Sequence, residues 1–329
     1  MRWLIEQFSP SEMKTILHSK RANMYYLEHC RVLVNGGRVE YVTEEGKKSL
    51  YWNIPIANTT SILLGTGTSI TQQAVRELAK AGVLIGFCGG GGTPLLAGNE
   101  QTIEVEWFSP QSEYRPTEYL QKWVSFWFDD NKRLQAAKFF QKARVNQIRR
   151  HWLSNSIQRH YNFNVNQDQL DGLLNNFENA LEKCPDVSYV LSEEAKLTKA
   201  LYKLAAQSLS YGEFTRVKAG LGDDFANRFL DHGNYLAYGL GATAAWVLGL
   251  PHGLAVLHGK TRRGGLVFDI ADIIKDALVL PHAFISAMAG DEEQEFRSTC
   301  IDNFNQLQAL DVMIDTIKQT ATELEVASQ

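Results

Sequence analysis

The residues best suited to chemistry lie close together at the end of a long uncharged stretch. Between Asp231 and Lys260 the chain has no Asp, Glu, Lys or Arg, and His258 stands near the end of this stretch. Asp269 and Asp272 follow, and a separation of three residues places both carboxylates on one face of a helix. One imidazole and several carboxylates suit Mg²⁺ or Mn²⁺ better than a structural zinc site, which usually recruits cysteine. These residues therefore predict a site for one divalent cation.

A further acid, Glu194, is expected to complete this cation site. At about 100° per residue, Glu194 shares one helical face with a row of apolar side chains, and three lysines gather on the opposite face. A carboxylate that points inward is costly unless it is paired, hydrogen-bonded or bound to a metal. We predict that Glu194 shares the cation with His258 and the two aspartates Asp269 and Asp272. The alternative is an internal salt bridge or an interaction at the start of its helix.

The remaining charged residues around His258 allow two interpretations each. Asp276 lies one turn after Asp272 on the same helical face, and is either a further ligand or a solvated acid. Arg262 and Arg263 place cations near a substrate phosphate, or they only keep the surface soluble. Without a cation, the aspartates would cap a surface helix and His258 would be a hydrogen-bonded core residue. A metal, acids and arginines together favour phosphodiester chemistry, in which the ion stabilises the scissile phosphate and helps to deprotonate the attacking group.

A second feature is a basic segment without acids. Between Asn131 and Gln167 the sequence contains no Asp or Glu but many Lys and Arg residues, interleaved with Phe139, Phe140 and Trp152. Cations bind phosphates and aromatic faces stack on bases, so the segment favours contact with nucleic acid. The alternative is a solvated helix whose aromatic side chains face the core. The residues expected to contact DNA are Lys138, Lys142, Arg144, Arg149, Arg150, Arg262 and Arg263.

Composition limits the class of protein. The chain has 329 residues, 44% of them hydrophobic, which is enough for a large core and favours two domains. A net charge of −4 gives no overall attraction to nucleic acid, so that partner requires a local patch. Four widely spaced cysteines without a CxxC pair disfavour both a zinc ribbon and a disulfide framework. We find no signal peptide, and Pro251 interrupts the uncharged stretch, so we expect a cytoplasmic protein without a membrane partner.

The pattern along the chain changes from strands to helices. Residues 31–43, 49–56, 59–65 and 83–89 read as strands, with an Asn-Gly turn in the first segment and a helix over 68–82. Beyond a polar, proline-containing stretch at 109–118, helices are expected at about 117–150, 187–209, 224–249, 269–279 and 291–322, with 154–169 as a loop. We predict an α+β protein with an N-terminal β-rich dimerisation domain, residues 1–108, and a larger all-α catalytic domain, residues 109–329.

Two glycine-rich turns invite comparison with phosphate-binding loops. LLGTGTSIT stands between a strand and a helix but lacks the third glycine of GxGxxG, and no Gly-Lys-Ser/Thr follows it. GFCGGGGTP, residues 86–94, has no lysine to reach a phosphate. A tight turn and a loop at a strand end are the preferred interpretations, and a dinucleotide-binding enzyme is kept as an alternative.

Three segments carry a resemblance to a known family. LHGKTRRGGLVFDIADIIKDALVLP, EEAKLTKALYKLAAQ and LLGTGTSITQQAVRELAKAGVLIGFCGGGG resemble the CRISPR-associated endonuclease and integrase that captures new spacers, in its type I-F form. The resemblance extends over nearly the whole chain. It implies a β-rich domain joined to a helical domain, a homodimer, and a divalent ion held by a glutamate, a histidine and an aspartate. At matching positions these are Glu194, His258 and Asp272, with Asp269 as an additional acid.

The same resemblance implies further residues, partners and a reaction. The segment NRFLDHGNYLAYG matches a motif of Asn and Tyr residues near the site, at Asn227, Asn234, Tyr235 and Tyr238. The implied substrate is duplex prespacer DNA, whose 3′-hydroxyl ends are joined by transesterification to the repeat at the leader end of a CRISPR array during adaptive immunity. The implied partner is the small second adaptation protein, fused in this subtype to the helicase-nuclease. The competing interpretation is a non-catalytic scaffold that binds nucleic acid through the basic segment.

Overall fold

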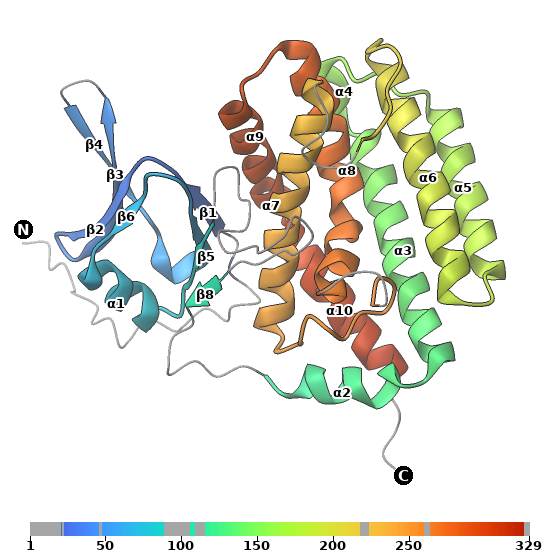
Figure 1. The fold of residues 1–329 in the computed structure, drawn as a ribbon, viewed down its shortest axis with the longest axis horizontal. Coiled ribbons are helices and arrows are strands. Elements are labelled where there is room, and N and C mark those ends of the chain that lie inside the picture. The colour runs from blue at the N-terminus through green and yellow to red at the C-terminus, as the bar shows by residue number, and fades with distance from the viewer. Residues whose placement is uncertain are drawn as a thin grey trace, which may run out of the picture.

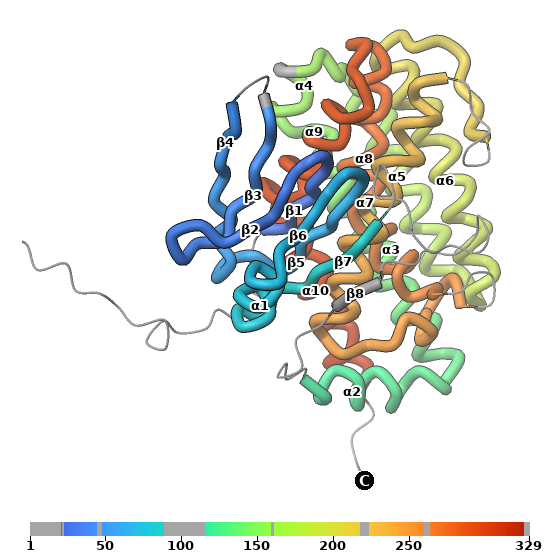
Figure 2. The backbone as a smooth tube through the Cα atoms, turned by 60° about the vertical axis from the view of Figure 1, so that its left-hand side comes forward, coloured from blue at the N-terminus to red at the C-terminus, as the bar shows by residue number. Residues whose placement is uncertain are grey.

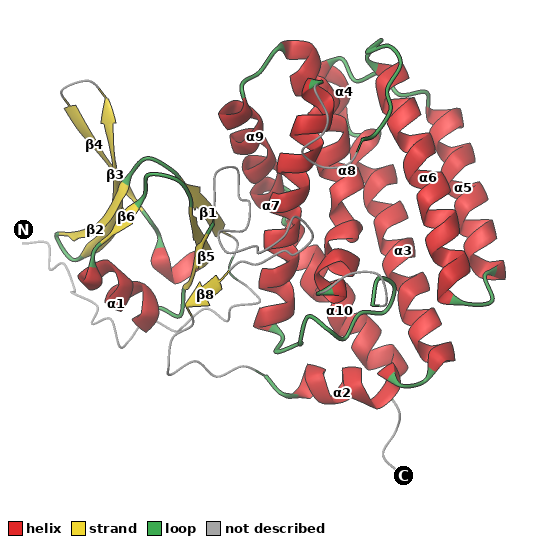
Figure 3. Ribbon diagram, in the orientation of Figure 1, coloured by secondary structure: helices red, strands yellow, loops and turns green. Residues whose placement is uncertain are grey.

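The chain folds into a strand-rich N-terminal part and a helical part that is larger (Figure 1). The computed structural model describes residue 21 and residues 23–45, 48–88, 106–108, 116–217, 224–259 and 264–325. Within these ranges the last strand ends at Phe108 and the first long helix begins at Glu118 (Figure 3). The α+β class and the order of its two parts are therefore confirmed, while the domain boundary between residues 108 and 109 stays a prediction.

The described residues of the N-terminal part form two four-stranded sheets. The first has the order β1 (Asn23–Leu27), β5 (Thr59–Leu64), β7 (Leu84–Phe87), β8 (Glu106–Phe108), with β8 antiparallel to β7 and the other pairs parallel. The second has the order β4 (Lys48–Asn53), β3 (Arg38–Glu45), β2 (Arg31–Asn35), β6 (Ser69–Ile70). Gly36 and Gly37 both have positive φ, as the tight turn between β2 and β3 requires. The expected hairpin is thus present, because its two central residues are glycines.

The turn after β5 explains the GTG motif. Helix α1 (Gln72–Lys80) follows it, and the Thr71 side chain accepts a hydrogen bond from the Ala74 amide as an N-cap. Gly67 has a φ of +70°, and a Cβ atom there would lie 2.5 Å from Nδ1 of His29. The glycine therefore allows a close approach of this turn to a neighbouring side chain, which supports the tight-turn interpretation.

The helical part is built from nine described helices, α2 to α10. They are α2 (Glu118–Trp127), α3 (Asp130–Trp152), α4 (Asn155–Tyr161), α5 (Gln167–Lys183), α6 (Val187–Ser208), α7 (Phe225–Val247), α8 (Gly265–Ala289), α9 (Glu293–Gln306) and α10 (Ala309–Leu324). Helix α8 lies at the centre, with nearly every residue buried, and it packs against α3, α6, α7, α9 and α10. A side chain on α8 therefore faces other helices rather than water.

Several helix boundaries differ from the sequence-based expectation. The helix expected at 117–150 is two helices, because the Asp129 carboxylate accepts hydrogen bonds from two backbone amides and starts α3. The loop expected at 154–169 contains α4 and the start of α5, where Ser154 and Asn166 are N-caps. The helix expected at 291–322 is also two, separated at Leu307–Gln308. Helix α8 is longer than expected and continues past Pro281.

The two parts pack against each other, with β1 close to α9 (Figure 2). Met24, Leu63 and Leu84 belong to the same buried hydrophobic cluster as the helices, whereas a smaller cluster lies within the strand-rich part. Arg297 of α9 pairs with Glu28 at 2.9 Å, next to β1. This shared burial holds the first sheet against the helices. Among the described helices, none combines the length and apolarity that crossing a bilayer would need.

Candidate functional site

Three segments bring the predicted site residues toward one another. Asp269, Asp272 and Asp276 project from α8, Glu194 comes from α6, and His258 comes from the segment between α7 and α8. Two tryptophans of α2 hold that segment by donating indole hydrogen bonds, 2.9 Å to the Leu254 carbonyl and 2.8 Å to the Ala255 carbonyl. The polypeptide around His258 is therefore fixed by α2 on one side and by α8 on the other.

Asp269 organises the chain before His258. Its Oδ2 accepts hydrogen bonds from the Val256 amide at 2.7 Å and the Leu257 amide at 3.0 Å. Its Oδ1 accepts from the His258 amide at 2.9 Å and lies 2.8 Å from Nδ1 of the same residue. An ionised carboxylate only accepts, so Nδ1 carries the proton and the lone pair of the neutral ring is on Nε2. Asp269 thus sets both the position and the tautomer of His258.

Asp272 is buried next to this histidine. Its Oδ2 lies 4.0 Å from Nδ1 of His258, and its Oδ1 lies 2.5 Å from Nζ of Lys275. Neither oxygen makes a hydrogen bond within the described residues, so the approach of Lys275 is an ion pair with poor hydrogen-bond direction. Asp272 is therefore a buried carboxylate whose charge is offset by Lys275 without a well-directed hydrogen bond, so its oxygens can accept a metal cation as a further partner.

The pKa values follow from these contacts. Burial lowers the pKa of His258, but the hydrogen bond with Asp269 and the charge of Asp272 outweigh it, so the net pKa is raised. Burial raises the pKa of Asp272, but Lys275, His258 and Arg144 outweigh it and the net pKa is lowered. Burial lowers the pKa of Lys275, and Asp272 more than reverses this. The carboxylate of Asp272 is therefore ionised near neutral pH and available to a cation.

Glu194 meets a cation of the chain itself. Arg144 of α3 is completely buried and donates to Oε1 of Glu194 at 2.9 Å, while its other terminal nitrogen donates to Asp276 and, at 2.6 Å, to Thr198. Burial lowers the pKa of Arg144, but Asp276 and Glu194 more than reverse this and the net pKa is raised. The expectation that Arg144 contacts DNA is wrong, because its guanidinium is enclosed by acids. The salt-bridge alternative for Glu194 is present.

The donor set suits a hard divalent cation. Carboxylate oxygens and one imidazole are ligands that Mg²⁺ and Mn²⁺ accept, and the strongest structural support is the buried Asp272 carboxylate, whose oxygens accept no well-directed hydrogen bond in the described structure. No three His, Cys, Asp or Glu side chains of the described chain are already arranged as metal ligands, although His258 lies beside both aspartates. The structure therefore brings His258, Asp269 and Asp272 together and links Glu194 to the same α8 face through Arg144. Direct coordination stays a prediction.

Three of the other basic residues contact α5 while staying partly exposed to water. Lys138 donates to the Glu182 carbonyl, Lys142 pairs with the Glu182 carboxylate at 2.6 Å, and Arg149 pairs with Glu178 at 3.0 Å. The acids missing from the sequence segment thus come from another helix. Phe140 and Trp152 are buried, so the expectation that they stack on bases is wrong; Phe139 is partly buried against the core. Arg150 is exposed, and Arg262 and Arg263 lie outside the described residues.

The Asn and Tyr motif divides into two groups. Asn227 is buried, and its side chain forms hydrogen bonds with Arg216, Val217, Thr215 and Asp224. Its polar atoms therefore fix the segment before α7 and are not directed at a ligand. Tyr235 and Tyr238 form a ring contact. The ring centroids of Tyr238 and Phe268 are 4.8 Å apart, and those of Phe268 and His258 are 6.3 Å apart.

The tyrosines thus reach the site through Phe268. For Asn234, which is partly exposed, no contact with the acids is seen in the described structure.

Lys275 is the site residue that the sequence-based reasoning missed, and Arg144 was given the wrong role. Both had a signal in the sequence. Lys275 follows Asp272 at the i,i+3 spacing of helical neighbours. Arg144 lies four residues from both Phe140 and Ile148, which are buried, so helical periodicity places it on the buried face of α3.

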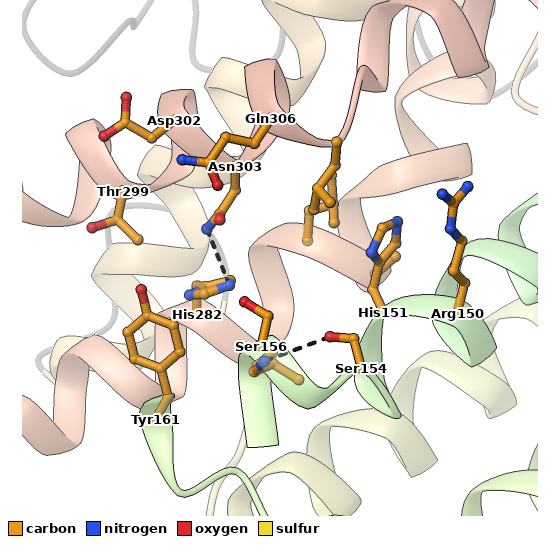
Figure 4. Close-up of a pocket in the computed structure, with 14 residues that line it drawn as sticks. Arg150, His151, Ser154, Ser156, Tyr161, His282, Thr299, Asp302, Asn303 and Gln306 are labelled. Carbon is orange, nitrogen blue, oxygen red and sulfur yellow. Dashed lines mark hydrogen bonds between the residues drawn. The ribbon is translucent and has the colours of Figure 1, made fainter. Parts of the chain in front are cut away.

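A polar cavity of about 320 Å³ lies further along α8 (Figure 4). Arg150, His151, Tyr161, His282 and Asp302 are among its lining residues. Burial, with the neighbouring His151, lowers the pKa of His282 to about 4, and Asn303 contacts its Nε2 at 3.1 Å. None of the acids that approach His258 lines this cavity, so it does not carry the candidate chemistry.

Comparison with known proteins assigns the family. A family model described as "CRISPR associated protein Cas1" matches residues 25–286. The chain belongs to the Cas1 family. It is 66% identical to the CRISPR-associated endonuclease Cas1 of Pseudomonas aeruginosa, over 98% of this chain and all of that one. Identity to the Cas1 endonuclease of Pectobacterium atrosepticum is 67%, over 96% of this chain and 97% of that one. The family resemblance found in the sequence is thus confirmed.

Solved structures show the same fold at much lower identity. The Cas1 protein of Thermotoga maritima superposes with a TM-score of 0.67 at 16% identity, covering 93% of this chain and 99% of that one. A casposase bound to its integration product gives a TM-score of 0.66 at 13% identity, covering 92% and 91%. These matches establish the fold, in which the Cas1 chain combines a strand-rich part with a helical part.

Proposed function

We propose that this Cas1 chain is a divalent-metal-dependent DNA endonuclease and integrase that inserts prespacer DNA into a CRISPR array. Its high identity to two curated Cas1 endonucleases supports the enzyme class. The observation that carries the metal site is Asp272, whose two buried oxygens lack hydrogen bonds within the described residues and lie beside His258. Glu194, His258 and Asp272 would hold Mg²⁺ or Mn²⁺, and the ion would stabilise charge on the scissile phosphate and acidify the attacking hydroxyl.

The residues of the chain have separate tasks in this proposal. Asp269 accepts a hydrogen bond from Nδ1–H of His258, which leaves the lone pair of the ring on Nε2 for a metal ion. Histidines that bind metals commonly donate their other ring N–H to a carboxylate in this way. In strand transfer, the prespacer 3′-hydroxyl oxygen forms a bond to an array phosphorus. The bond from that phosphorus to the array 3′-oxygen breaks. The attacking hydroxyl gives its proton to solvent or a base, and the departing array 3′-oxygen takes up a proton. With water as the nucleophile, the same site cuts DNA.

The partners are part of the proposal. Double-stranded DNA is the substrate, as prespacer and as CRISPR repeat and leader, and the exposed Arg150 together with Lys138, Lys142 and Arg149 would contact its phosphates. Solved relatives include a Cas1 described in complex with DNA and a Cas6-RT-Cas1–Cas2 complex. We further propose a homodimer, a type I-F second adaptation protein fused to the helicase-nuclease, and a cytoplasmic location.

The test is a strand-transfer assay with a labelled prespacer, an array fragment, the partner protein and Mg²⁺ or Mn²⁺. Glu194→Gln, His258→Asn and Asp272→Asn are each expected to lower the rate at least about 100-fold, because removing a group that stabilises the transition state has effects of this size. Chelation of the metal should do the same. Glu193→Gln is the matched control, since Glu193 is adjacent to Glu194 but pairs with Lys196 at the surface.

Full activity in all three site variants would favour the non-catalytic scaffold. Retained cutting after chelation would remove the metal from the mechanism while leaving the family assignment unchanged.

A further inference from the structure

We infer that Arg144 is a positioning residue that holds Glu194 in place for the cation, and that Asp276 makes this possible by neutralising Arg144. The inference rests on the proposed function, because it concerns a carboxylate assigned there to the metal. It gives Arg144 and Asp276 a role that neither the basic segment nor the aspartate spacing indicated.

The first support is the way in which Arg144 is held. Its side chain has no exposed surface, and its two terminal nitrogens contact both α6 and α8. One nitrogen donates to Glu194 at 2.9 Å and to Gln141 at 2.9 Å, and the other donates to Thr198 and to Asp276. A planar guanidinium with several fixed partners cannot turn without breaking them all. Arg144 therefore ties α6 to α8 at the level of the site.

The second support is which oxygen of Glu194 is used. Arg144 donates to Oε1, and the Thr198 hydroxyl donates to the same atom at 3.0 Å. Both of these hydrogen bonds fall on Oε1, so Oε2 is the atom through which Glu194 would reach a cation. Carboxylates that bind metals are commonly hydrogen-bonded by outer partners, and loss of such a partner weakens metal binding about 10- to 100-fold. Arg144 and Thr198 have the geometry of such partners.

The third support is the charge balance. A guanidinium close to a metal ligand would repel a divalent cation unless an acid offsets its charge. Asp276 does so, since it pairs directly with Arg144 and is itself buried. With this pair neutral, the charge of Glu194 remains available, and Arg144 acts on it mainly through direction. Asp276 is thus neither a spare ligand nor a solvated acid, but the counter-ion of the positioning arginine.

The experiment measures Mn²⁺ affinity calorimetrically for the full chain, with circular dichroism as a check on folding. Arg144→Lys keeps the buried charge but loses the fork that reaches both Glu194 and Asp276. We expect Mn²⁺ to bind about 10- to 100-fold more weakly. Arg133→Lys on the same helix is the control, because Arg133 pairs with Asp130 near the surface. Its Mn²⁺ affinity should equal that of the unaltered protein.

A double variant separates positioning from general structural support. If Arg144 acts through Glu194, then Arg144→Lys should have no further effect on Mn²⁺ affinity in a Glu194→Gln background. Additive losses would overturn the inference, as would an unchanged affinity in Arg144→Lys alone while Glu194→Gln binds weakly. An unchanged affinity in Glu194→Gln would remove both this inference and the assignment of Glu194 as a ligand.

Thr198→Val keeps the test decisive should Arg144→Lys fail to fold. This change removes the hydroxyl between Arg144 and Glu194 but leaves the buried arginine paired. We expect a smaller loss of Mn²⁺ affinity in the same direction, and no further loss in a Glu194→Gln background. Affinity equal to that of the unaltered protein would contradict the positioning role.

Discussion

Replacing Asp269 with Asn tests how firmly the chain before His258 is held. The carboxylate of Asp269 has no exposed surface and accepts from the amides of Val256, Leu257 and His258. Asn has a single acceptor oxygen. Its amide nitrogen, which is a donor, would take the place of one Asp269 oxygen and face the donors that this oxygen had accepted from. With His258 in the Nδ1–H tautomer, either orientation of the Asn side chain loses two hydrogen bonds from buried donors: those of the Val256 and Leu257 amides, or those of the His258 amide and Nδ1–H.

The magnitude follows from those two donors. A buried donor left without its acceptor costs about 1–3 kcal/mol, so Asp269→Asn should destabilise the protein by about 2–6 kcal/mol. For a folded unit of roughly 200 residues, each kcal/mol lowers the melting temperature by about 2–4 °C. The expected decrease is therefore about 4–24 °C, which is large enough to measure.

The assay is thermal unfolding followed by circular dichroism, with Asp186→Asn as the matched control. Asp186 is also a carboxylate that accepts from two backbone amides, those of Ser188 and Tyr189, but it is exposed at the start of α6. Asn caps a helix about as well as Asp, so this control should change little. A melting temperature of Asp269→Asn equal to that of the control would refute the reasoning, because it would show that the buried acceptor is not needed.

Three further predictions concern the pocket, the helix packing and DNA. The pKa of His282 is about 4 in the folded protein, so between about pH 6.5 and 4 only the unfolded state binds a proton at this residue. The free energy of unfolding therefore falls as pH falls through this range. His282→Gln should reduce the dependence of that free energy on pH by up to about 1.4 kcal/mol per pH unit, as measured by urea unfolding. Gly241→Ala places a Cβ 2.8 Å from the Val267 carbonyl and should cost about 1–3 kcal/mol, whereas Gly239→Ala, 3.5 Å from Leu63, should be neutral or mildly stabilising by the same assay. The third prediction concerns Lys138→Gln, Lys142→Gln and Arg149→Gln, each of which removes one positive charge. In filter binding, the slope of log affinity against log salt concentration should flatten by about 0.9 for each DNA phosphate that is no longer neutralised. An unchanged slope would show that DNA binds elsewhere on the protein.

Local patterns predicted most of the fold. The expected Asn-Gly turn and the alternation around it indicated the hairpin, although its central residues are Gly36 and Gly37, one position later. Apolar periodicity predicted α6 and α7 to within about two residues. Strands β1 and β8 were not predicted, and β6 lies inside the segment expected as a helix. Other errors lie where a polar residue caps a helix. Ser154 and Asn166 look like loop residues in sequence, yet their side chains accept from backbone amides and begin α4 and α5. Composition alone does not distinguish these two uses of a polar side chain.

Helix α8 was underestimated for a different reason. Proline lacks an amide hydrogen and usually ends a helix, which places the end of the helix before Pro281. Here the helix continues to Ala289, and the residues on both sides of the proline are buried among other helices. Packing around the central helix therefore outweighs the loss of one backbone hydrogen bond, and that packing comes from segments distant in sequence.

The acids of the site were found from spacing, but their partners were not. Arg144 was grouped with surface cations because its neighbours in sequence are basic. In the folded chain it contacts both Glu194, which is 50 residues away in sequence, and Asp276, which is 132 residues away. A sequence without aligned relatives shows which side chains need a partner, but not which distant residue supplies it. The inward direction of Glu194 was predictable, whereas the identity of its partner was not.

The way in which each acid is satisfied points to the place where a cation gains most. A buried carboxylate is stable only when hydrogen bonds or opposite charges replace water. Asp269 has hydrogen bonds from backbone amides, and Glu194 has hydrogen bonds from Arg144 and Thr198. Asp272 has an ion pair with Lys275, and its Oδ2 lies 4.0 Å from Nδ1 of His258, but neither oxygen accepts a well-directed hydrogen bond in the described structure. A hard dication therefore stabilises the Asp272 carboxylate more than it stabilises the other two acids. Asp272→Asn should accordingly lower metal affinity more than Glu194→Gln does.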